Sequence, residues 1–281
     1  MKKKLLFMGT PGFAVSTLKA LVEQNTFSIT VVTKPDKARG RGKKISASEI
    51  KQVALEQNLP VYTPKNKDEL TQVVNNIQPD LIIVIAYYMI LPKRITDTYY
   101  CINCHASLLP QLRGASPIQS SLLHRDKKTG ITLIKMNEKM DEGDILSKRE
   151  HIISPEETYA ELSHALSLLS ASLLCELLSQ YPTLSKIPRT KQNQTKASYC
   201  HKLDKADRQL NPTDPIQKKL GQIKAFSPKP GAFLIQERRH IKIIDACIAE
   251  KKLVPLIVQP EGKKPMSYKA YQQGYPSDLL L

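Results

Sequence analysis

Short apolar segments alternate with amphipathic segments along most of this chain, and that order constrains the fold more than any other feature of the sequence. The apolar segments are rich in β-branched residues, as buried strands are, and the segments between them have helical periodicity. In chain order they predict strands at 4–8, 27–33, 80–86, 131–136 and 145–153, and helices at 14–24, 48–57 and 67–77. An order of strand, helix and strand is typical of a doubly wound, mainly parallel α/β sheet.

A long helix is predicted after residue 153. Ser154 has the position of an N-cap, Pro155 that of the first helical residue, and Glu157 closes a capping box. The helix runs to about Gln180, and its regularly spaced Leu and Ala side chains indicate core packing.

The chain changes character after this helix. Residues 181–198 are polar and basic with no apolar period, which is typical of a linker. Beyond them a short helix is predicted at 216–225 and strands at 232–236, 241–249 and 253–259, which indicate a small β-barrel. We therefore expect a catalytic domain at 1–181, a basic linker at 182–199 and a C-terminal barrel domain at 200–281.

The positive charge is concentrated in the C-terminal part. The net charge of +16 divides into +5 for residues 1–181 and +11 for residues 182–281. A field of this sign favours a polyanionic partner, above all nucleic acid, and the alternative is a basic surface without a partner. No apolar run is predicted to span a bilayer, so we expect a soluble chain without a membrane partner.

Residues 101–117, CINCHASLLPQLRGASP, carry the best candidate for a reaction centre. They lie between the predicted strands at 80–86 and 131–136. Asn103 and His105 are two residues apart, so they share one face of a strand where the chain leaves the sheet. Ligands bind at that end of the strands in open α/β sheets.

The same segment fits the C-x-x-C-H pattern of covalent haem attachment, but the N-terminus argues against that interpretation. Covalent haem belongs to exported proteins, whereas the apolar run at 5–8 is a first strand rather than a signal peptide. Zinc is disfavoured because Cys175, Cys200 and Cys247 are scattered singly. We expect reduced thiols in a cytoplasmic protein, with neither haem nor metal.

Two glycine-containing loops differ in what they predict. The first, at 9–12, lacks the G-x-G-x-x-G spacing of a dinucleotide site. The second, at 34–44, reads KPDKARGRGKK and has no apolar residue larger than alanine to anchor it to a core. Such a loop suits binding of a phosphate backbone, or it is a solvated surface loop.

The order of short motifs resembles that of the methionyl-tRNA formyltransferase family over nearly the whole chain. Asn103, His105 and the following SLLP are common to folate-dependent formyltransferases, including those that act on glycinamide ribonucleotide and on sugar nucleotides. The RGRGKK loop at 39–44 and EGKKPM at 261–266 select the tRNA enzymes. Other matching strings are GTP at 9–11, AY at 86–87, ILP at 90–92, RGA at 113–115, PIQ at 117–119, MDEGD at 140–144, AF at 225–226 and PGA at 230–232. The resemblance implies a Rossmann-like formyltransferase domain and an OB-like barrel.

The resemblance also implies a reaction. The formyl group of 10-formyltetrahydrofolate would pass to the α-amino group of methionyl-tRNA for translation initiation. Attack of an amine on a formyl carbon needs a donor to the developing oxyanion and an acceptor for the amine proton. Asn103 and His105 would donate to the formyl oxygen, while Asp141 would orient His105 and help to remove the proton.

The family's binding residues carry over by position. The folate is expected to contact Tyr87, Tyr88, Met89, Ile90, Leu91, Ser107, Leu108, Leu109, Pro110, Asn137 and Met140. The tRNA is expected to contact Arg39, Arg41, Lys43, Lys44, Lys191, Lys196, Arg238, Lys263 and Lys264.

Three departures from the family pattern bear on binding. Tyr88 stands where a small or flexible residue is usual, so its ring is expected to narrow the pterin site. A strand pair is missing before residue 261, which predicts an abbreviated barrel, and Lys229 stands where a Trp is common.

Rival functions are a sugar-nucleotide amine N-formyltransferase, which needs no basic C-terminal half, and a catalytically silent RNA-binding relative. With no interface signal in the sequence, a monomer is expected.

Overall fold

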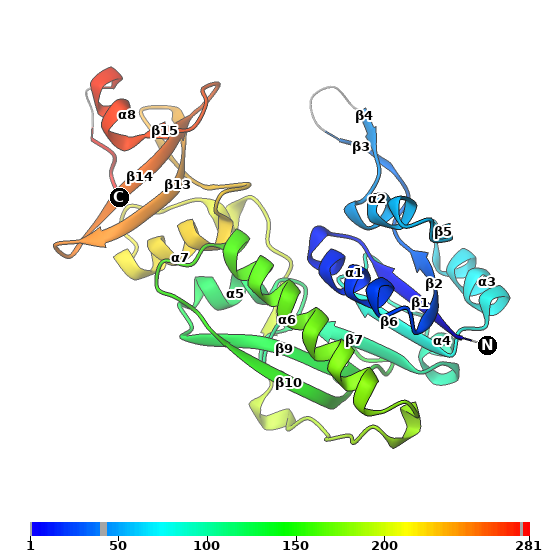
Figure 1. The fold of residues 1–281 in the computed structure, drawn as a ribbon. Coiled ribbons are helices and arrows are strands. Elements are labelled where there is room, and N and C mark those ends of the chain that lie inside the picture. The colour runs from blue at the N-terminus through cyan, green and yellow to red at the C-terminus, as the bar shows by residue number, and fades with distance from the viewer. Residues whose placement is uncertain (1, 40–43, 276–277) are drawn as a thin grey trace. The chain divides into compact units, whose positions relative to one another are not determined.

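The computed structural model describes residues 2–39, 44–275 and 278–281, and it divides into two compact units (Figure 1). Unit 1 consists of Met1–Arg113, Gly130–His151 and His164–Ser198. Unit 2 consists of Gly114–Thr129, Ile152–Ser163 and Tyr199–Leu281. The units are interleaved along the chain, whereas we expected boundaries at residues 181 and 199.

Unit 1 is built on a seven-stranded sheet with the strand order β10-β9-β7-β6-β1-β2-β5. Neighbouring strands among β7, β6, β1, β2 and β5 pair in parallel, whereas β9 pairs with β7 antiparallel. The predicted mainly parallel α/β sheet is confirmed. The strand bounds are β1 (Lys3–Gly9), β2 (Phe27–Val32), β5 (Val61–Tyr62), β6 (Leu81–Ile85), β7 (Cys101–His105), β9 (Lys128–Lys135) and β10 (Asp144–Ile152).

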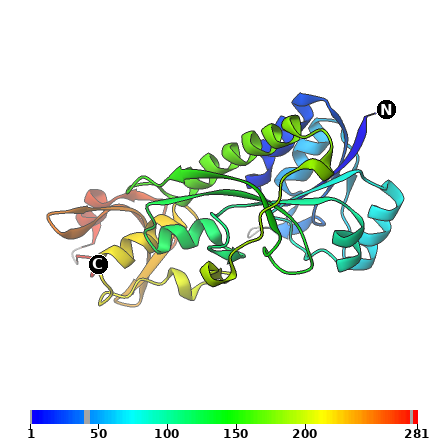
Figure 2. The same cartoon turned by 90° about the horizontal axis from the view of Figure 1, so that it is seen from below.

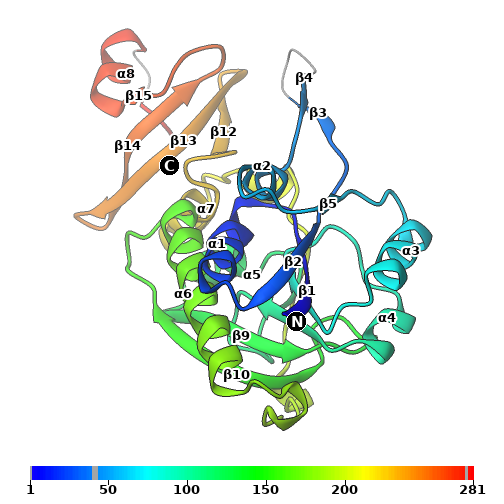
Figure 3. The same ribbon diagram turned by 45° about the vertical axis from the view of Figure 1, so that its right-hand side comes forward.

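Helices bury the apolar side chains of this sheet. Leu6 and Met8 of β1 belong to one core cluster with side chains of α3 (Lys67–Ile77) and α4 (Lys93–Thr98). Helix α1 (Val15–Gln24) lies beside α6 (Tyr159–Gln180), where the Ser167 hydroxyl bonds the Ser16 hydroxyl at 2.8 Å (Figure 3). Figure 2 shows α6 running along the sheet, and Arg149 of β10 donates to Glu176 of that helix at 2.6 Å. All five residues of β6 are buried, which explains why that strand reads as one apolar run.

Helix α6 begins later than the sequence predicted. The backbone N–H of Glu157 bonds the carbonyl of Ser154, so residues 154–157 form a turn instead of the first helical turn. Thr158 and Glu161 form the capping box: the Glu161 carboxylate accepts from the Thr158 N–H at 2.8 Å, and the Thr158 hydroxyl accepts from the Glu161 N–H at 3.5 Å. The Glu157 carboxylate does accept from the Ser154 N–H at 3.0 Å, as the predicted capping box requires, but the helix starts after Thr158.

Helix α6 is as long and as apolar as a membrane-spanning helix. It has 22 residues and contains an 18-residue apolar window with a mean hydropathy of 1.4, so by length and composition it is able to cross a membrane, contrary to our expectation for the chain. Half of that apolar window (50%) is buried inside the protein, as in a core helix. The finding is therefore weak evidence for a membrane span.

Residues 182–198 pack on unit 1. The backbones of Ile145 and Thr190 exchange two hydrogen bonds of 2.8 and 2.9 Å. Ile187 and Gln192 are 3% and 7% exposed. This segment is therefore part of unit 1 and pairs with β10 at Ile145, although its composition is that of a linker.

The flanks of the basic loop are strands. β3 (Lys37–Arg39) pairs antiparallel with β4 (Lys44–Ser46). The next helix, α2 (Glu49–Glu56), begins at Ser48, whose hydroxyl accepts from the Lys51 N–H at 3.1 Å.

Unit 2 carries a four-stranded antiparallel sheet of order β12-β13-β14-β15. Its elements are β12 (Ala232–Gln236), β13 (Arg239–Ala249), β14 (Lys252–Pro260), β15 (Met266–Ser267), and helices α5 (Pro117–Leu123), α7 (Ile216–Phe226) and α8 (Tyr268–Gly274). The predicted C-terminal β-structure is confirmed, and its strands are antiparallel. Within the described strands it takes the form of an open sheet, with β12 and β15 at its edges, where we expected an abbreviated barrel.

Two-residue turns join β12 to β13 and β13 to β14. Glu237 and Arg238 have φ angles of 50° and 61°, and Glu250 and Lys251 have φ angles of 49° and 61°. Positive φ at both central residues is the backbone of a type I′ hairpin turn, which usually contains Asn or Gly. The charged residues in these turns gave no such signal in the sequence.

A buried cation ties the middle segments to unit 2. Lys224 of α7 is 2% exposed, and its ammonium lies 2.9 Å from carboxylate oxygens of both Glu156 and Asp245. Although burial opposes its charge, these two partners hold the pKa of Lys224 above its ordinary value. The segment Ile152–Ser163 therefore contributes directly to the packing of unit 2.

Candidate active site

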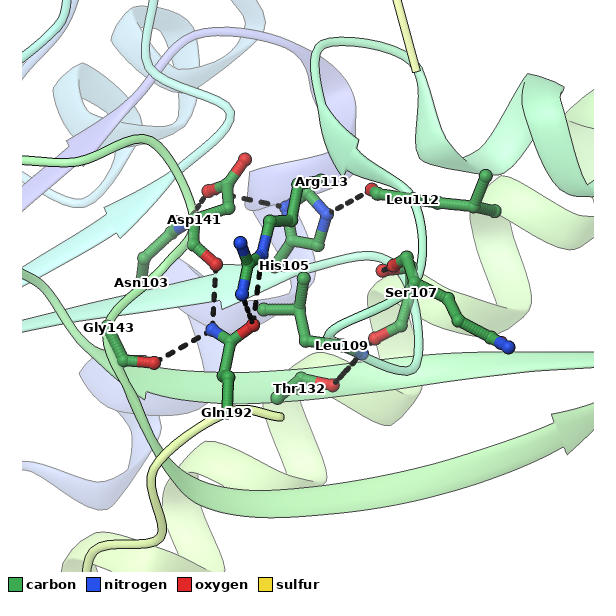
Figure 4. A network of polar contacts seen from close by, with 11 residues as sticks. Asn103, His105, Ser107, Leu109, Leu112, Arg113, Thr132, Asp141, Gly143 and Gln192 are labelled. Carbon is green, nitrogen blue, oxygen red and sulfur yellow. Dashed lines mark hydrogen bonds and ion pairs between the residues drawn. The ribbon is translucent and has the colours of Figure 1, made fainter. Parts of the chain in front are cut away.

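The candidate site lies at the carboxyl end of β7, as the spacing of Asn103 and His105 predicted. β7 lies between β6 and β9 in the sheet of unit 1. Asn103 is half-buried and His105 is 6% exposed. Figure 4 shows both side chains directed toward Asp141, which lies in the loop between β9 and β10.

One carboxylate oxygen of Asp141 meets both of these side chains. Asn103 Nδ2 donates to Asp141 Oδ1 at 3.1 Å, and His105 Nδ1 lies 3.6 Å from the same oxygen. The structure thus brings together the three residues expected to be catalytic, from two segments 38 residues apart.

The other ring nitrogen of His105 is already bonded. His105 Nε2 lies 2.8 Å from the carbonyl oxygen of Leu112. A carbonyl oxygen only accepts, so Nε2 carries a hydrogen. The other ring nitrogen, Nδ1, is the one that faces Asp141.

The backbone at Asp141 has an unusual conformation that other residues hold in place. Asp141 has a φ of 55°, in the left-handed region. Gln192 Nε2 donates to the carbonyl oxygens of Asp141 and Gly143 at 2.7 and 2.8 Å. An added Cβ at Gly143 would lie 2.0 Å from the carbonyl oxygen of Lys135, so only glycine fits there.

Gln192 is held in turn by Arg113. Arg113 is fully buried, and its Nε and Nη2 donate to Gln192 Oε1 at 3.1 and 2.7 Å. Its Nη1 donates to Gln194 at 2.9 Å and lies 3.4 Å from Glu142. Our sequence reasoning assigned no role to Arg113 or Gln192. Arg113 lies within a motif that matches the family, but nothing in the composition of residues 181–198 marked Gln192.

The SLLP turn is largely internal. The Ser107 hydroxyl donates to the carbonyl of Gln111 at 2.6 Å, and Leu109 is 0% exposed. Thr132 of β9 bonds both the Ser107 carbonyl and the Leu109 N–H. Leu108 and Pro110 are half-buried. Of the four residues expected to bind folate here, Ser107 and Leu109 are therefore placed to shape the turn.

The loop after β6 carries the other expected folate residues. It begins at Ala86, which has a φ of 47°. Leu91 is buried in a core cluster, and Tyr87 and Met89 pack against that cluster. Tyr88 and Ile90 are exposed. Burial raises the pKa of Tyr87, so its phenol stays protonated at neutral pH.

Two contacts hold the side chain of Tyr88 in place. Its hydroxyl donates to the carbonyl of Pro64, and its ring meets that of Tyr87 edge-on with centroids 4.8 Å apart. The ring therefore has a fixed position beside the start of α3.

A polar depression of about 440 Å³ lies next to the Asp141 loop. Asn137, expected to contact folate, and Lys191, expected to contact tRNA, both line it. Met140, on the same loop, is 55% exposed.

The remaining residues expected to contact tRNA are spread over the chain. Lys196, Arg238, Lys263 and Lys264 are exposed. Arg39 lies at the end of β3 and Lys44 at the start of β4. Arg41 and Lys43 lie outside the described residues.

The two cysteines of β7 are not nucleophiles in this structure. Burial raises the pKa of Cys101 to about 12 and that of Cys104 to about 12. Both thiols are therefore protonated at neutral pH and act as core side chains.

Comparison with known proteins identifies the family. The Formyl transferase family matches residues 2–178 of this chain. The chain belongs to that family. Among its relatives is the methionyl-tRNA formyltransferase of Coxiella burnetii (strain CbuK_Q154), which is 37% identical over 276 residues, covering 96% of this chain and 88% of the relative.

Solved structures of other proteins share the fold. Methionyl-tRNA formyltransferase from Clostridium thermocellum superposes with a TM-score of 0.66 at 21% identity, covering 92% of this chain and 98% of that chain. HypX from Aquifex aeolicus in complex with tetrahydrofolic acid superposes with a TM-score of 0.71 at 13% identity, covering 99% of this chain and 48% of that chain.

Proposed function

We propose that this chain transfers the formyl group of 10-formyltetrahydrofolate to the α-amino group of methionine esterified to initiator tRNA, in the cytoplasm, for translation initiation. The observation that carries the proposal is that Asn103 Nδ2 and His105 Nδ1 both approach the same carboxylate oxygen, Asp141 Oδ1. The match to methionyl-tRNA formyltransferases over nearly the full chain supports the choice of acceptor.

The geometry suits proton removal from an attacking amine. His105 Nε2 is held by the Leu112 carbonyl, which leaves Nδ1 as the proton acceptor. Once Nδ1 is protonated, the positive ring lies 3.6 Å from the Asp141 carboxylate, which stabilises that charge. His105 in this orientation takes the amine proton, whereas the sequence suggested that it donates to the formyl oxygen.

Asn103 suits the oxygen of the reacting formyl group. Its Nδ2 carries two hydrogens, and Asp141 accepts one of them. The second hydrogen would meet the oxyanion that forms when the amine attacks. The residues present therefore fit 10-formyltetrahydrofolate, which supplies an activated formyl group; the loops at 86–91 and 137–141 would hold it.

The basic residues suit the tRNA. Lys191 and Lys196 lie on the segment that packs along unit 1, and Arg238, Lys263 and Lys264 are exposed on unit 2. Phosphate contacts of this kind supply affinity without reading sequence.

A direct assay tests the proposal. The purified chain is incubated with 10-formyltetrahydrofolate and either methionyl-tRNA or an aminosugar nucleotide, and the products are separated. We expect N-formylmethionine on the tRNA only. Formylation of the sugar alone would show a sugar-nucleotide enzyme, and binding of tRNA without any formylation would show a silent relative.

A further inference from the structure

We propose that Gln192 and Arg113 are positioning residues for the catalytic pair, and that they act by holding the backbone that carries Asp141. The inference rests on the proposed function and adds to it two residues that do not touch the reacting atoms. Four hydrogen bonds, each within unit 1, carry it.

Asp141 lies in a loop whose backbone is bonded on both sides of the next residue. The left-handed region is less favourable than the right-handed one for a non-glycine residue, so bonds to the neighbouring backbone stabilise Asp141 at its φ of 55°. Gln192 provides these bonds, because one amide nitrogen bonds the carbonyls on both sides of Glu142. With 7% of Gln192 exposed, little water competes for these bonds.

Arg113 fixes the orientation of the Gln192 amide. Its oxygen accepts two N–H groups of Arg113, at 3.1 and 2.7 Å. A flipped amide would place its NH₂ group against the guanidinium and its oxygen against two carbonyls. Arg113 therefore fixes which end of Gln192 faces the Asp141 loop.

Arg113 also lies next to the residue that bonds His105. Leu112, whose carbonyl accepts from His105 Nε2, is the residue immediately before Arg113. One dipeptide thus positions both catalytic groups: its backbone fixes the proton on His105, and its side chain fixes Asp141 through Gln192. A shift of this dipeptide would change the 3.6 Å separation of His105 and Asp141 from both sides.

The test uses Gln192→Glu with Gln194→Glu as its matched control. Glutamate at 192 keeps the side-chain shape and still accepts from Arg113, but it loses both donors to the Asp141 loop. Gln194 also accepts from Arg113, at 2.9 Å, and it is exposed. We expect Gln192→Glu to lower kcat about 10- to 100-fold, the scale of a small misplacement of catalytic groups, with KM for methionyl-tRNA within about twofold. Gln194→Glu should keep kcat near that of the parent.

A second arm separates positioning from a merely structural role. In an Asp141→Asn background, Gln192→Glu should lower kcat by less than about twofold further, because the group it positions is already gone. Equal losses in both backgrounds, or a kcat of Gln192→Glu within twofold of the parent, would overturn the inference. Gln192→Met, which also lacks both donors, replaces Gln192→Glu in the same cycle if the glutamate variant does not fold.

A third arm does not depend on the reaction. Hydrogen exchange, followed by mass spectrometry, should be faster in the peptide covering residues 137–143 of Gln192→Glu and unchanged in Gln194→Glu. Unchanged exchange in both variants would overturn the inference. Absence of methionyl-tRNA formylation by the parent would instead overturn the proposed function, and the exchange comparison would still decide whether Gln192 holds the loop.

Discussion

The Nε2 atom of His105 lies 2.8 Å from the carbonyl oxygen of Leu112, seven residues further along the chain. A carbonyl oxygen only accepts, so this bond places a hydrogen on Nε2 and leaves Nδ1 facing Asp141. Nδ1 lies 3.6 Å from Asp141 Oδ1, and under the proposed function the two side chains would act as a pair.

Removing either member of this pair should abolish most activity. We expect His105→Ala or Asp141→Asn to lower the rate of formyl transfer at least about 100-fold, the usual scale for loss of an acid/base group or an oxyanion donor. Binding of tRNA, followed by filter retention, should stay nearly unchanged. A variant with most of its turnover intact would remove that residue from the mechanism.

Two glycines allow a matched test of the Asp141 loop. An added Cβ would lie 2.0 Å from the Lys135 carbonyl oxygen at Gly143 and 2.9 Å from the Leu122 carbonyl oxygen at Gly221, in α7. Both alanine variants should lower the thermal unfolding temperature, because the backbone must move in each. Only Gly143→Ala should also lower kcat strongly, since it lies two residues from Asp141. Equal kcat values in the two variants would argue against a loop that must be held in place.

Tyr88 offers a test of the loop after β6. We expect Tyr88→Phe to weaken binding of 5-formyltetrahydrofolate roughly threefold, because the loop loses the bond to Pro64 that orders it. Calorimetric titration measures this affinity. Tighter binding by Tyr88→Gly would instead support the original hypothesis that the ring narrows the pterin site.

The two basic regions should differ in their contributions to tRNA recognition. Lys251, Lys252, Lys263 and Lys264 are exposed, whereas Arg41 lies outside the described residues. Neutralising the four lysines should weaken affinity and flatten its salt dependence by about one unit of log–log slope for each phosphate that these side chains pair with. Arg41→Ala should depress catalytic efficiency and blur initiator selection, as a residue that positions the acceptor end would. An unchanged salt slope in the lysine variant would exclude those side chains from the tRNA surface.

His240 should make the stability of unit 2 depend on pH. Its ring stacks on Phe233 with centroids 4.2 Å apart, and burial followed by the nearby Lys205 charge lowers the pKa of His240 below its ordinary value of 6.5. A group with a lowered folded pKa takes up its proton first in the unfolded chain, so stability is full above pH 6.5 and falls as the pH drops below it. Denaturant unfolding of His240→Phe should show a smaller loss over that range, while His164→Gln, at an exposed position, should follow the parent.

Local sequence was enough to predict the sheet of unit 1, most of its helices and the pair at the end of β7. Short-range rules suffice for these features: β6 is apolar because both of its faces are buried, and even spacing places Asn103 and His105 on one face. Helix α2, with Ser48 as its N-cap, lies within the helix predicted at 48–57. The start of α6 was missed because Thr158 outcompetes Ser154 as the cap, which local sequence does not rank.

The way the site is held together depends on long-range packing. Asp141 reaches Asn103 across 38 residues, and Arg113 reaches Gln192 across 79. No periodicity joins residues so far apart in the chain, and Gln192 lies in a segment with the composition of a linker. The tautomer of His105 likewise depends on the Leu112 carbonyl, a backbone group that has no sequence signature. The sequence therefore predicted which groups lie at the end of β7, and three-dimensional packing determined which atoms of these groups face one another.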